Sequence, residues 1–312
     1  MTSYILKRLA YTVPTIFGVL LLTFLLFNLI EGDVSAELAG PDATPQTIKE
    51  VREQYGLNKP RFVAWDSQFF NHIRNALTFD FGRARDREPV SQKIKRGLGP
   101  TLAVTVPIFV GTLVVSVSVA LIVAALHGTI WDITALVICV IGMSMPYLGF
   151  VLLGQYLLAY RWSLAPVFFS PDLPLAQNVA LPVVLGIVAG LGSNVRFYRA
   201  IMLDQIHSHY VRTAYAKGLS TRGVLFRHVL RNAMIPIIAR MSMAVPYLFV
   251  GSLLLERFFG IAGLGSMMID AVAARDYAVI NAMTFIGALI FIICDLFADI
   301  SYHLIDPRVR LG

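Results

Sequence analysis

The chain has 312 residues, of which 57% are hydrophobic and 14% are charged, and it carries a net charge of +7. Soluble domains have about 25% charged residues, so this composition excludes an ordinary soluble protein and indicates an integral membrane protein. Its basic residues are not interleaved with aromatic ones, as they are in proteins that bind nucleic acid. Cys139 and Cys294 lie far apart inside apolar runs, which predicts free thiols rather than a disulfide or a metal site.

The first 30 residues are expected to form a short cytoplasmic stub and the first transmembrane helix. The apolar run Leu9–Ile30 has 22 residues, enough to cross a hydrocarbon core of about 30 Å. It is longer than the core of a signal peptide, and no cleavage site with small residues follows it. We therefore expect an uncleaved helix that starts on the cytoplasmic side.

Residues 31–99 are polar in character and predict a small extracytoplasmic segment. Helices are expected at Thr47–Tyr55 and Phe62–Leu77. The second contains several aromatic residues, including Trp65 and Phe70, at close to helical spacing. These side chains either pack the small segment and rest at the membrane interface, or they contact another molecule directly.

Residues 100–312 are expected to contain five further transmembrane helices. These are Pro100–Leu126, Ile133–Tyr160, Leu181–Ala200, Ile237–Leu255 and Ile280–Leu304. Proline inside a membrane helix frees a carbonyl group, which a nearby serine can satisfy, so Ser144 and Pro146 predict a bend in the third helix and are candidates for the translocation path. Residues 256–279, which include Met267, are expected to form a second exposed outer segment.

The loop at residues 201–236 interrupts the apolar sequence. Its first part, Asp204–Lys217, predicts one helix with Ile206, Tyr210 and Ala214 on the same face. Gly218 predicts the end of that helix, because glycine adopts the left-handed conformation without strain. Ser220 predicts the cap of a second, basic helix that leads to Pro236.

The distribution of Lys and Arg places this loop and both termini on the cytoplasmic side. No phosphate-binding glycine loop and no nucleophile elbow is present in the sequence. Asp295 and Asp299, near the inner end of the last helix, either serve transport or pair with Arg196, Arg199 or Arg308 at the boundary.

Arg212, Thr213 and Ala214, followed by three residues and Gly218, resemble the coupling loop of ABC importer membrane subunits, whose general pattern is Glu-Ala-Ala, three residues, Gly. The sequence RTAYAKG followed by RHVLRNAMIP is similar to that of the dipeptide, oligopeptide and nickel permease family. Further landmarks of that family are Gly32-Asp33, the run Gly56 to Pro60, Asp80-Phe81-Gly82, a Gly-Leu-Gly at 263–265, and Asp306-Pro307-Arg308. Arg212 and Thr213 depart from the general pattern, Glu31 and Ala262 stand where the family usually has proline, and Ile235-Pro236 lies further from the glycine than in that pattern.

The resemblance implies an all-α, six-helix permease of the type I ABC importer kind, in the bacterial inner membrane, that imports peptides or similar small solutes. It implies a second homologous permease, two ATP-binding subunits that hydrolyse ATP, and an extracytoplasmic solute-binding protein, with no cofactor on this chain. The ATPase would meet the loop at Tyr210, Arg212, Thr213, Ala214, Lys217 and Gly218. We expect the binding protein to dock at Trp65, Phe70 and Met267 because they lie in the two outer segments. An ion-coupled secondary transporter is the alternative, but it requires an internal repeat and ionisable residues at mid-membrane, which the sequence does not show. The solute itself is left open.

Overall fold

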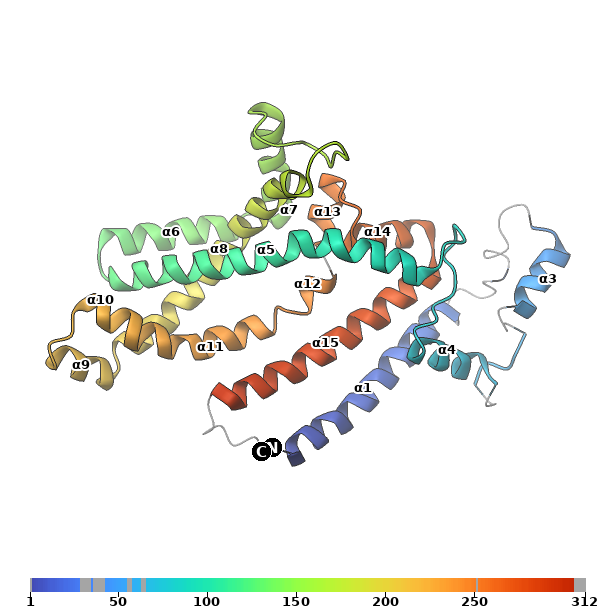
Figure 1. The fold of residues 1–312 in the computed structure, drawn as a ribbon, viewed down its shortest axis with the longest axis horizontal. Coiled ribbons are helices and arrows are strands. Elements are labelled where there is room, and N and C mark those ends of the chain that lie inside the picture. The colour runs from blue at the N-terminus through green and yellow to red at the C-terminus, as the bar shows by residue number, and fades with distance from the viewer. Residues whose placement is uncertain are drawn as a thin grey trace. The chain divides into compact units, whose positions relative to one another are not determined.

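The computed structural model describes residues 2–28, 35, 43–54, 58–62, 66–250 and 252–305. For 2–9, 26–28, 51, 54, 250 and 297–305 it describes the backbone alone. The described chain is helical, with an isolated β-bridge between Arg83 and Pro89 (Figure 1). It divides into two compact units, Met1–Gly97 with Met267–Ile293, and Leu98–Ser266 with Cys294–Gly312.

Three helices contain the unit boundaries: α5 (Val90–Ala125), α14 (Leu264–Ala274) and α15 (Tyr277–Ile305). The other helices of the first unit are α1 (Thr2–Asn28), α3 (Pro45–Gln54) and α4 (Gln68–Leu77). The remaining elements belong to the second unit. They are α6 (Ile130–Ser144), α7 (Tyr147–Gly154), η1 (Gln155–Arg161), α8 (Leu175–Ile206), α9 (His209–Ala216), α10 (Thr221–Val224), η2 (Leu225–Leu230), α11 (Arg231–Ser242), α12 (Tyr247–Val250) and α13 (Leu253–Phe259).

Local capping explains where the short helices of the first unit begin. The Thr44 hydroxyl accepts a hydrogen bond from the Thr47 amide at 3.3 Å, and Pro45 occupies the first position of α3, where its missing N–H costs nothing. The helix predicted at 47–55 is therefore confirmed over 47–54, with its start two residues earlier at Pro45, and Tyr55 lies outside the described residues. The predicted helix at 62–77 begins later, at Gln68, because the Ser67 hydroxyl accepts from the Phe70 amide at 3.2 Å and caps α4 there.

Aromatic side chains of α4 and its approach pack onto α1. Phe24 is fully buried, and its ring lies 5.3 Å from that of Phe62, 5.1 Å from that of Phe69 and 5.9 Å from that of His72. Edge-to-face pairs at such distances are favourable beyond the area that they bury. These rings therefore pack the small unit, which is one of the two roles expected for the aromatic stretch.

Three described helices are long and apolar enough to cross a membrane: α5, α8 and the described part of α15. The number rises to five if each of two bent helix pairs is counted as one span. The pair Ile130–Ser144 and Tyr147–Arg161 bends by 93°, and the pair Thr221–Ser242 and Tyr247–Phe259 bends by 47°. The bend predicted at Ser144 and Pro146 in the third helix is thus confirmed, and the predicted fifth helix over 237–255 is likewise interrupted near Pro246. The described apolar part of α1, Ala10–Leu25, is shorter than a full span.

Candidate functional site

The single helix predicted over 204–217 is divided in the structure into the last residues of α8 and the short helix α9. α8 ends at Ile206, and Ser208 has an extended backbone with φ −72° and ψ 153° before α9 begins. The Ser208 hydroxyl donates to the Gln205 carbonyl at 2.6 Å, and the Tyr210 hydroxyl donates to the Gln205 side-chain oxygen at 2.7 Å. These contacts fix the turn, so Ile206 does not share a helix with Ala214 as the spacing predicted.

Helix α9 has an inner and an outer face. Val211 and Ala214 are 1% and 5% exposed and belong to a core that includes Leu121 of α5, Met202 of α8 and Ile237 of α11. The outer face consists of exposed side chains, namely His209, Tyr210, Arg212, Thr213, Tyr215 and Lys217. We predicted that Ala214 faces a partner; the structure turns it into the core of its own chain instead.

Gly218 ends α9 in the conformation that the sequence predicts. Its φ is +79°, its N–H donates to the Tyr215 carbonyl at 2.9 Å, and the Leu219 N–H donates to the Ala214 carbonyl at 3.3 Å. This is the Schellman pair of bonds. The Ser220 hydroxyl then accepts from the Gly223 amide at 3.3 Å, which confirms the predicted cap of the next helix.

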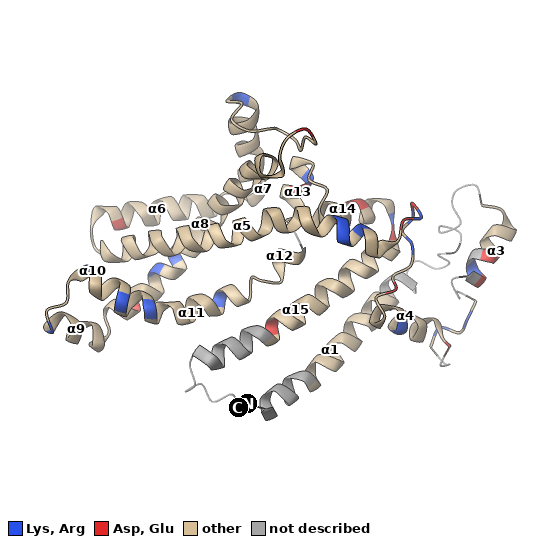
Figure 2. Ribbon diagram, in the orientation of Figure 1, with Lys and Arg blue, Asp and Glu red and all other residues tan. Residues whose placement is uncertain are grey.

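Basic side chains continue along α10, η2 and α11. Arg222, Arg227, Arg231 and Arg240 are all exposed. In Figure 2, α6 and the part of α5 that follows its basic N-terminal turns are almost free of charge, whereas blue positions gather on α8 and on α10 to α11. The second unit thus combines an apolar body with a basic end that includes α9.

A buried acid lies at this same end, where α5 turns into α6. Asp132 is 3% exposed and accepts two hydrogen bonds from Arg199 of α8, both at 2.7 Å. The Gly128 amide donates to it at 3.1 Å, and His127 contacts it at 3.0 Å. The ring of His127 lies 6.2 Å from that of His207, at the turn before α9. Arg199 was considered as a partner for Asp295 or Asp299, but it pairs with Asp132, which sequence reasoning missed.

A second buried acid, Glu256, lies in the segment 256–279, which was predicted to be exposed; at this residue the prediction is wrong. Glu256 of α13 is fully buried. Its carboxylate accepts from the Thr101 hydroxyl at 2.9 Å and from the Ser266 amide at 3.0 Å, and the Leu264 amide donates to Thr101 at 2.8 Å. Gly263 leaves room for this network, because a Cβ there would lie 2.6 Å from the Thr101 hydroxyl.

The residues predicted for binding-protein docking and for the translocation path lie on different elements. Phe70 on α4 is 38% exposed, and Met267 packs beside a small core that contains Ala271 and Val279. Ser144 and Pro146 are exposed at the 93° bend, where the Ser144 hydroxyl donates to the Val140 carbonyl at 2.9 Å. Some expectations fall outside the described residues or side chains: Trp65, the side chain of Asp299, Glu31, Gly32-Asp33, Gly56-Leu57 and Asp306-Pro307-Arg308.

The predicted free thiols agree with the structure, in which Cys139 and Cys294 form no disulfide. The buried acids, in contrast, have only a weak sequence signal. Asp132 stands out as an acid beside an apolar run, and Glu256 as an acid at the end of one. Neither position says which side chain will meet the carboxylate.

Known proteins are similar in sequence to this chain along its length. Residues 1–98 match the family described as binding-protein-dependent transport system membrane component, N-terminal, and residues 116–311 match the binding-protein-dependent transport system inner membrane component. The chain is 34% identical over 313 residues to the glutathione transport system permease protein GsiC of Escherichia coli (strain K12), covering 99% of each chain. The same values hold for GsiC of Escherichia coli O1:K1 / APEC and of Shigella dysenteriae serotype 1 (strain Sd197). The chain belongs to the family of binding-protein-dependent transport system inner membrane components and is an integral, multi-pass permease subunit of an ABC importer, distinct from the ATPase.

Proposed function

We propose that this permease imports di- or oligopeptides and that the outer face of α9 receives an ATP-binding subunit. The peptide class is supported by relatives named as glutathione transport permeases, since glutathione is itself a peptide. The resemblance of the loop to a coupling loop supports the role of α9. A second homologous permease and an extracytoplasmic binding protein complete the proposed transporter.

One observation carries the mechanical part of this proposal: α9 is packed into the core of its own chain. Val211 and Ala214 contact a cluster built from α5, α6, α8, η2 and α11. Because close-packed interiors transmit strain, a force on the outer face of α9 reaches these helices directly. ATP-driven closure of the partner subunits would thus move α9 and the helices that cross the membrane together.

The proposed orientation places α9 and both termini in the cytoplasm and residues 31–99 outside, with α1 as the first of six spans. The basic end of the second unit supports it, since Lys and Arg favour the cytoplasmic side. A cysteine introduced at Ser220 into a cysteine-free chain should resist an impermeant reagent in intact spheroplasts, whereas one at Asp42 should react. Labelling at Ser220 would overturn this orientation.

The coupling proposal is tested by reversing charge on the outer face. Arg212→Glu should leave the chain inserted and abundant, because the side chain is exposed, while copurification of the ATP-binding subunits and peptide uptake both fall. Arg222→Glu provides the matched control, since Arg222 is an exposed arginine on α10, and it should do much less. Equal retention of ATPase and uptake in both variants would contradict the role of α9.

Two further substitutions separate docking from packing. Ala214→Trp overfills a buried position, which typically costs about 1–3 kcal/mol, so it should lower the amount of folded permease as well as its coupling. Gly218→Val has open space around it but must keep a positive φ, at a cost of about 1–2 kcal/mol. The substitution should therefore disturb only the end of α9. We expect the permease to be nearly as abundant as the wild type but to copurify with less of the ATP-binding subunits.

A further inference from the structure

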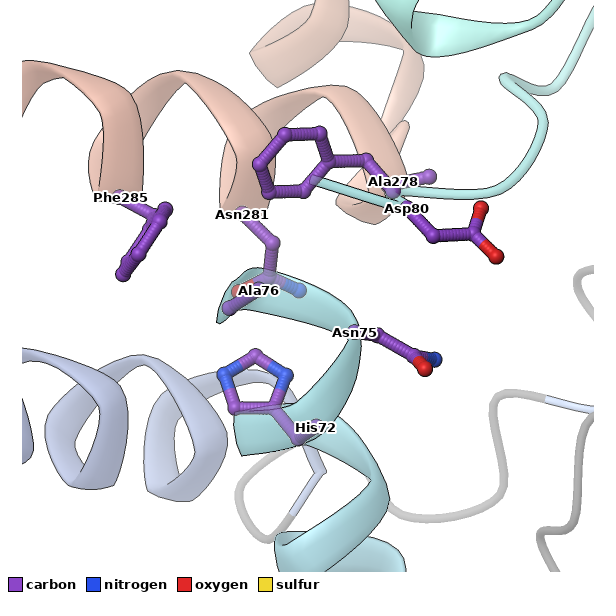
Figure 3. A pocket seen from close by; sticks show the side chains of 8 residues that line it. His72, Asn75, Ala76, Asp80, Ala278, Asn281 and Phe285 are labelled. Atoms are coloured by element: carbon purple, nitrogen blue, oxygen red, sulfur yellow. The ribbon is translucent and has the colours of Figure 1, made fainter. Parts of the chain in front are cut away.

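The first unit contains a cavity that is lined neither by α9 nor by the two buried acids described above. Its volume is about 130 Å³, and it is lined by α4, the turn after it and α15 (Figure 3). An apolar cavity of about 150 Å³ holds one benzene molecule, and drug-sized ligands occupy roughly 300–1,000 Å³. The cavity therefore fits a head group of a few heavy atoms and is too small for a whole peptide.

One atom in the cavity lacks the hydrogen bond that its burial requires. The Oδ1 atom of Asn281 is buried and has no hydrogen-bond partner among the described residues. Figure 3 shows the Asn281 side chain reaching from α15 towards Ala76 of α4, with the ring of His72 nearby. A buried acceptor without a donor costs about 1–3 kcal/mol, so a ligand that brings a donor would gain from meeting it.

His72 adds a second acceptor. The Thr23 hydroxyl donates to the Leu20 carbonyl at 3.1 Å, so its oxygen accepts from Nε2 of His72 at 3.2 Å. This arrangement leaves Nδ1 of the neutral ring as an acceptor. Burial lowers the pKa of His72, which favours that neutral form.

Negative charge and aromatic rings complete the lining. Asp80 and Asn75 are exposed and lie at one side of the cavity in Figure 3. The Gly82 amide donates to one oxygen of Asp80 at 3.3 Å, which leaves the other carboxylate oxygen available. Phe81 and Phe285 also line the space, and aromatic faces attract cations. None of the described lining residues is a lysine or an arginine.

We propose that this cavity binds a primary ammonium group, carried either by a small alkylamine or by the amino terminus of a peptide. Such a group supplies N–H donors for the unpaired amide oxygen and the imidazole nitrogen, and its positive charge suits the carboxylate of Asp80 at the edge of the cavity. Among the lining residues Asp80 carries a negative charge and none carries a fixed positive charge, which disfavours an anion. Among the described residues, no group of three His, Cys, Asp or Glu side chains could hold a metal ion. The proposal rests on the atoms of the cavity and does not depend on the solute that the permease imports.

Binding of ethylammonium to the full chain in lipid nanodiscs tests the proposal by saturation-transfer NMR. Ethylammonium should bind, whereas ethanol, which has the same size without the charge, should not. Asp80→Asn keeps an oxygen for the Gly82 amide and removes the charge, so affinity should fall roughly tenfold, as expected for loss of one charged hydrogen bond. Asn281→Leu should abolish binding.

Asp66→Asn is the matched control, because Asp66 is an exposed carboxylate of the same unit that pairs with Lys59 at 2.6 Å; its affinity should stay at the wild-type value. If Asn281→Leu does not fold, the comparison of Asp80→Asn with the wild type still tests the proposal. Equal binding to wild type, Asp80→Asn and Asp66→Asn, equal binding of ethanol, or no binding of ethylammonium would each overturn the proposal.

Competition identifies the source of the group. If glycylglycine displaces ethylammonium and N-acetylglycylglycine does not, the site takes a peptide amino terminus. If neither dipeptide displaces it while methylammonium does, the site takes small free amines. Both results support an ammonium site.

Discussion

Asp132 and Glu256 are both buried acids that hold a turn, but their surroundings differ. Asp132 meets a cation, since Arg199 reaches both of its oxygens at 2.7 Å. Glu256 accepts hydrogen bonds from neutral donors, the Thr101 hydroxyl and the Ser266 amide near the start of α14. The first acid ties two long helices together, and the second shapes the turn between two short ones.

The difference predicts how each site fails. A buried ion pair that loses one member leaves an uncompensated charge, which is the more damaging change. A carboxylate held by neutral donors resembles an anion at a helix N-terminus, and an amide of the same shape can keep part of its hydrogen bonding. The pair at Asp132 should therefore be the more sensitive of the two.

The largest effect is expected for Arg199→Leu. Removal of one member of a buried pair typically costs about 3–5 kcal/mol, because Asp132 keeps its charge in a site that is only 3% exposed. The thermal unfolding temperature and the amount of inserted permease should both fall sharply.

The double variant Asp132→Leu/Arg199→Leu is the control for this prediction. With both charges gone, it should recover much of the loss, which a double-mutant cycle measures as a strong coupling. If the two single variants were additive, the ion pair would contribute nothing and the comparison would fail.

Glu256→Gln should have an intermediate effect. The amide oxygen of the glutamine can accept one of the two hydrogen bonds, from Ser266 or from Thr101. The NH2 group cannot accept the other one, so the second donor loses its acceptor. One unsatisfied buried group costs about 1–3 kcal/mol. Unfolding of the purified chain measures this loss, and Glu256→Asp, which retains the charge on a shorter side chain, separates charge from reach. A loss larger than that of Arg199→Leu would reverse the ranking of the two acids.

His72 gives the smallest expected effect and extends the comparison to a buried base. Burial lowers its pKa below the ordinary value of 6.5, so in the window just below that value the unfolded chain binds more protons than the folded one. Stability from this group is therefore fully present above pH 6.5 and declines as the pH falls towards the lowered pKa.

Unfolding of the wild type and of His72→Gln at pH 7.5 and 5.5 measures this decline. The wild type should lose more stability on acidification than the variant. The same loss in both would mean that His72 is not the group that responds.

The sequence by itself determined what depends on composition and on neighbours along the chain. The apolar content required a membrane protein, and the order of RTAYAKG and RHVLRNAMIP indicated the importer family. Gly218 predicted the end of α9 and Ser220 the cap after it, because both act through bonds to residues three to five positions away.

Only the tertiary structure decided the contacts between distant residues. Arg199 and Asp132 are 67 positions apart, and Thr101 and Glu256 are 155 apart, so no local pattern could pair them. The extended Ser208 separates Ile206 from the helix that holds Ala214, against the predicted spacing, and packing against α5, α8 and α11 decided that Ala214 is buried. Local rules place single turns, whereas burial and pairing depend on how the helices pack.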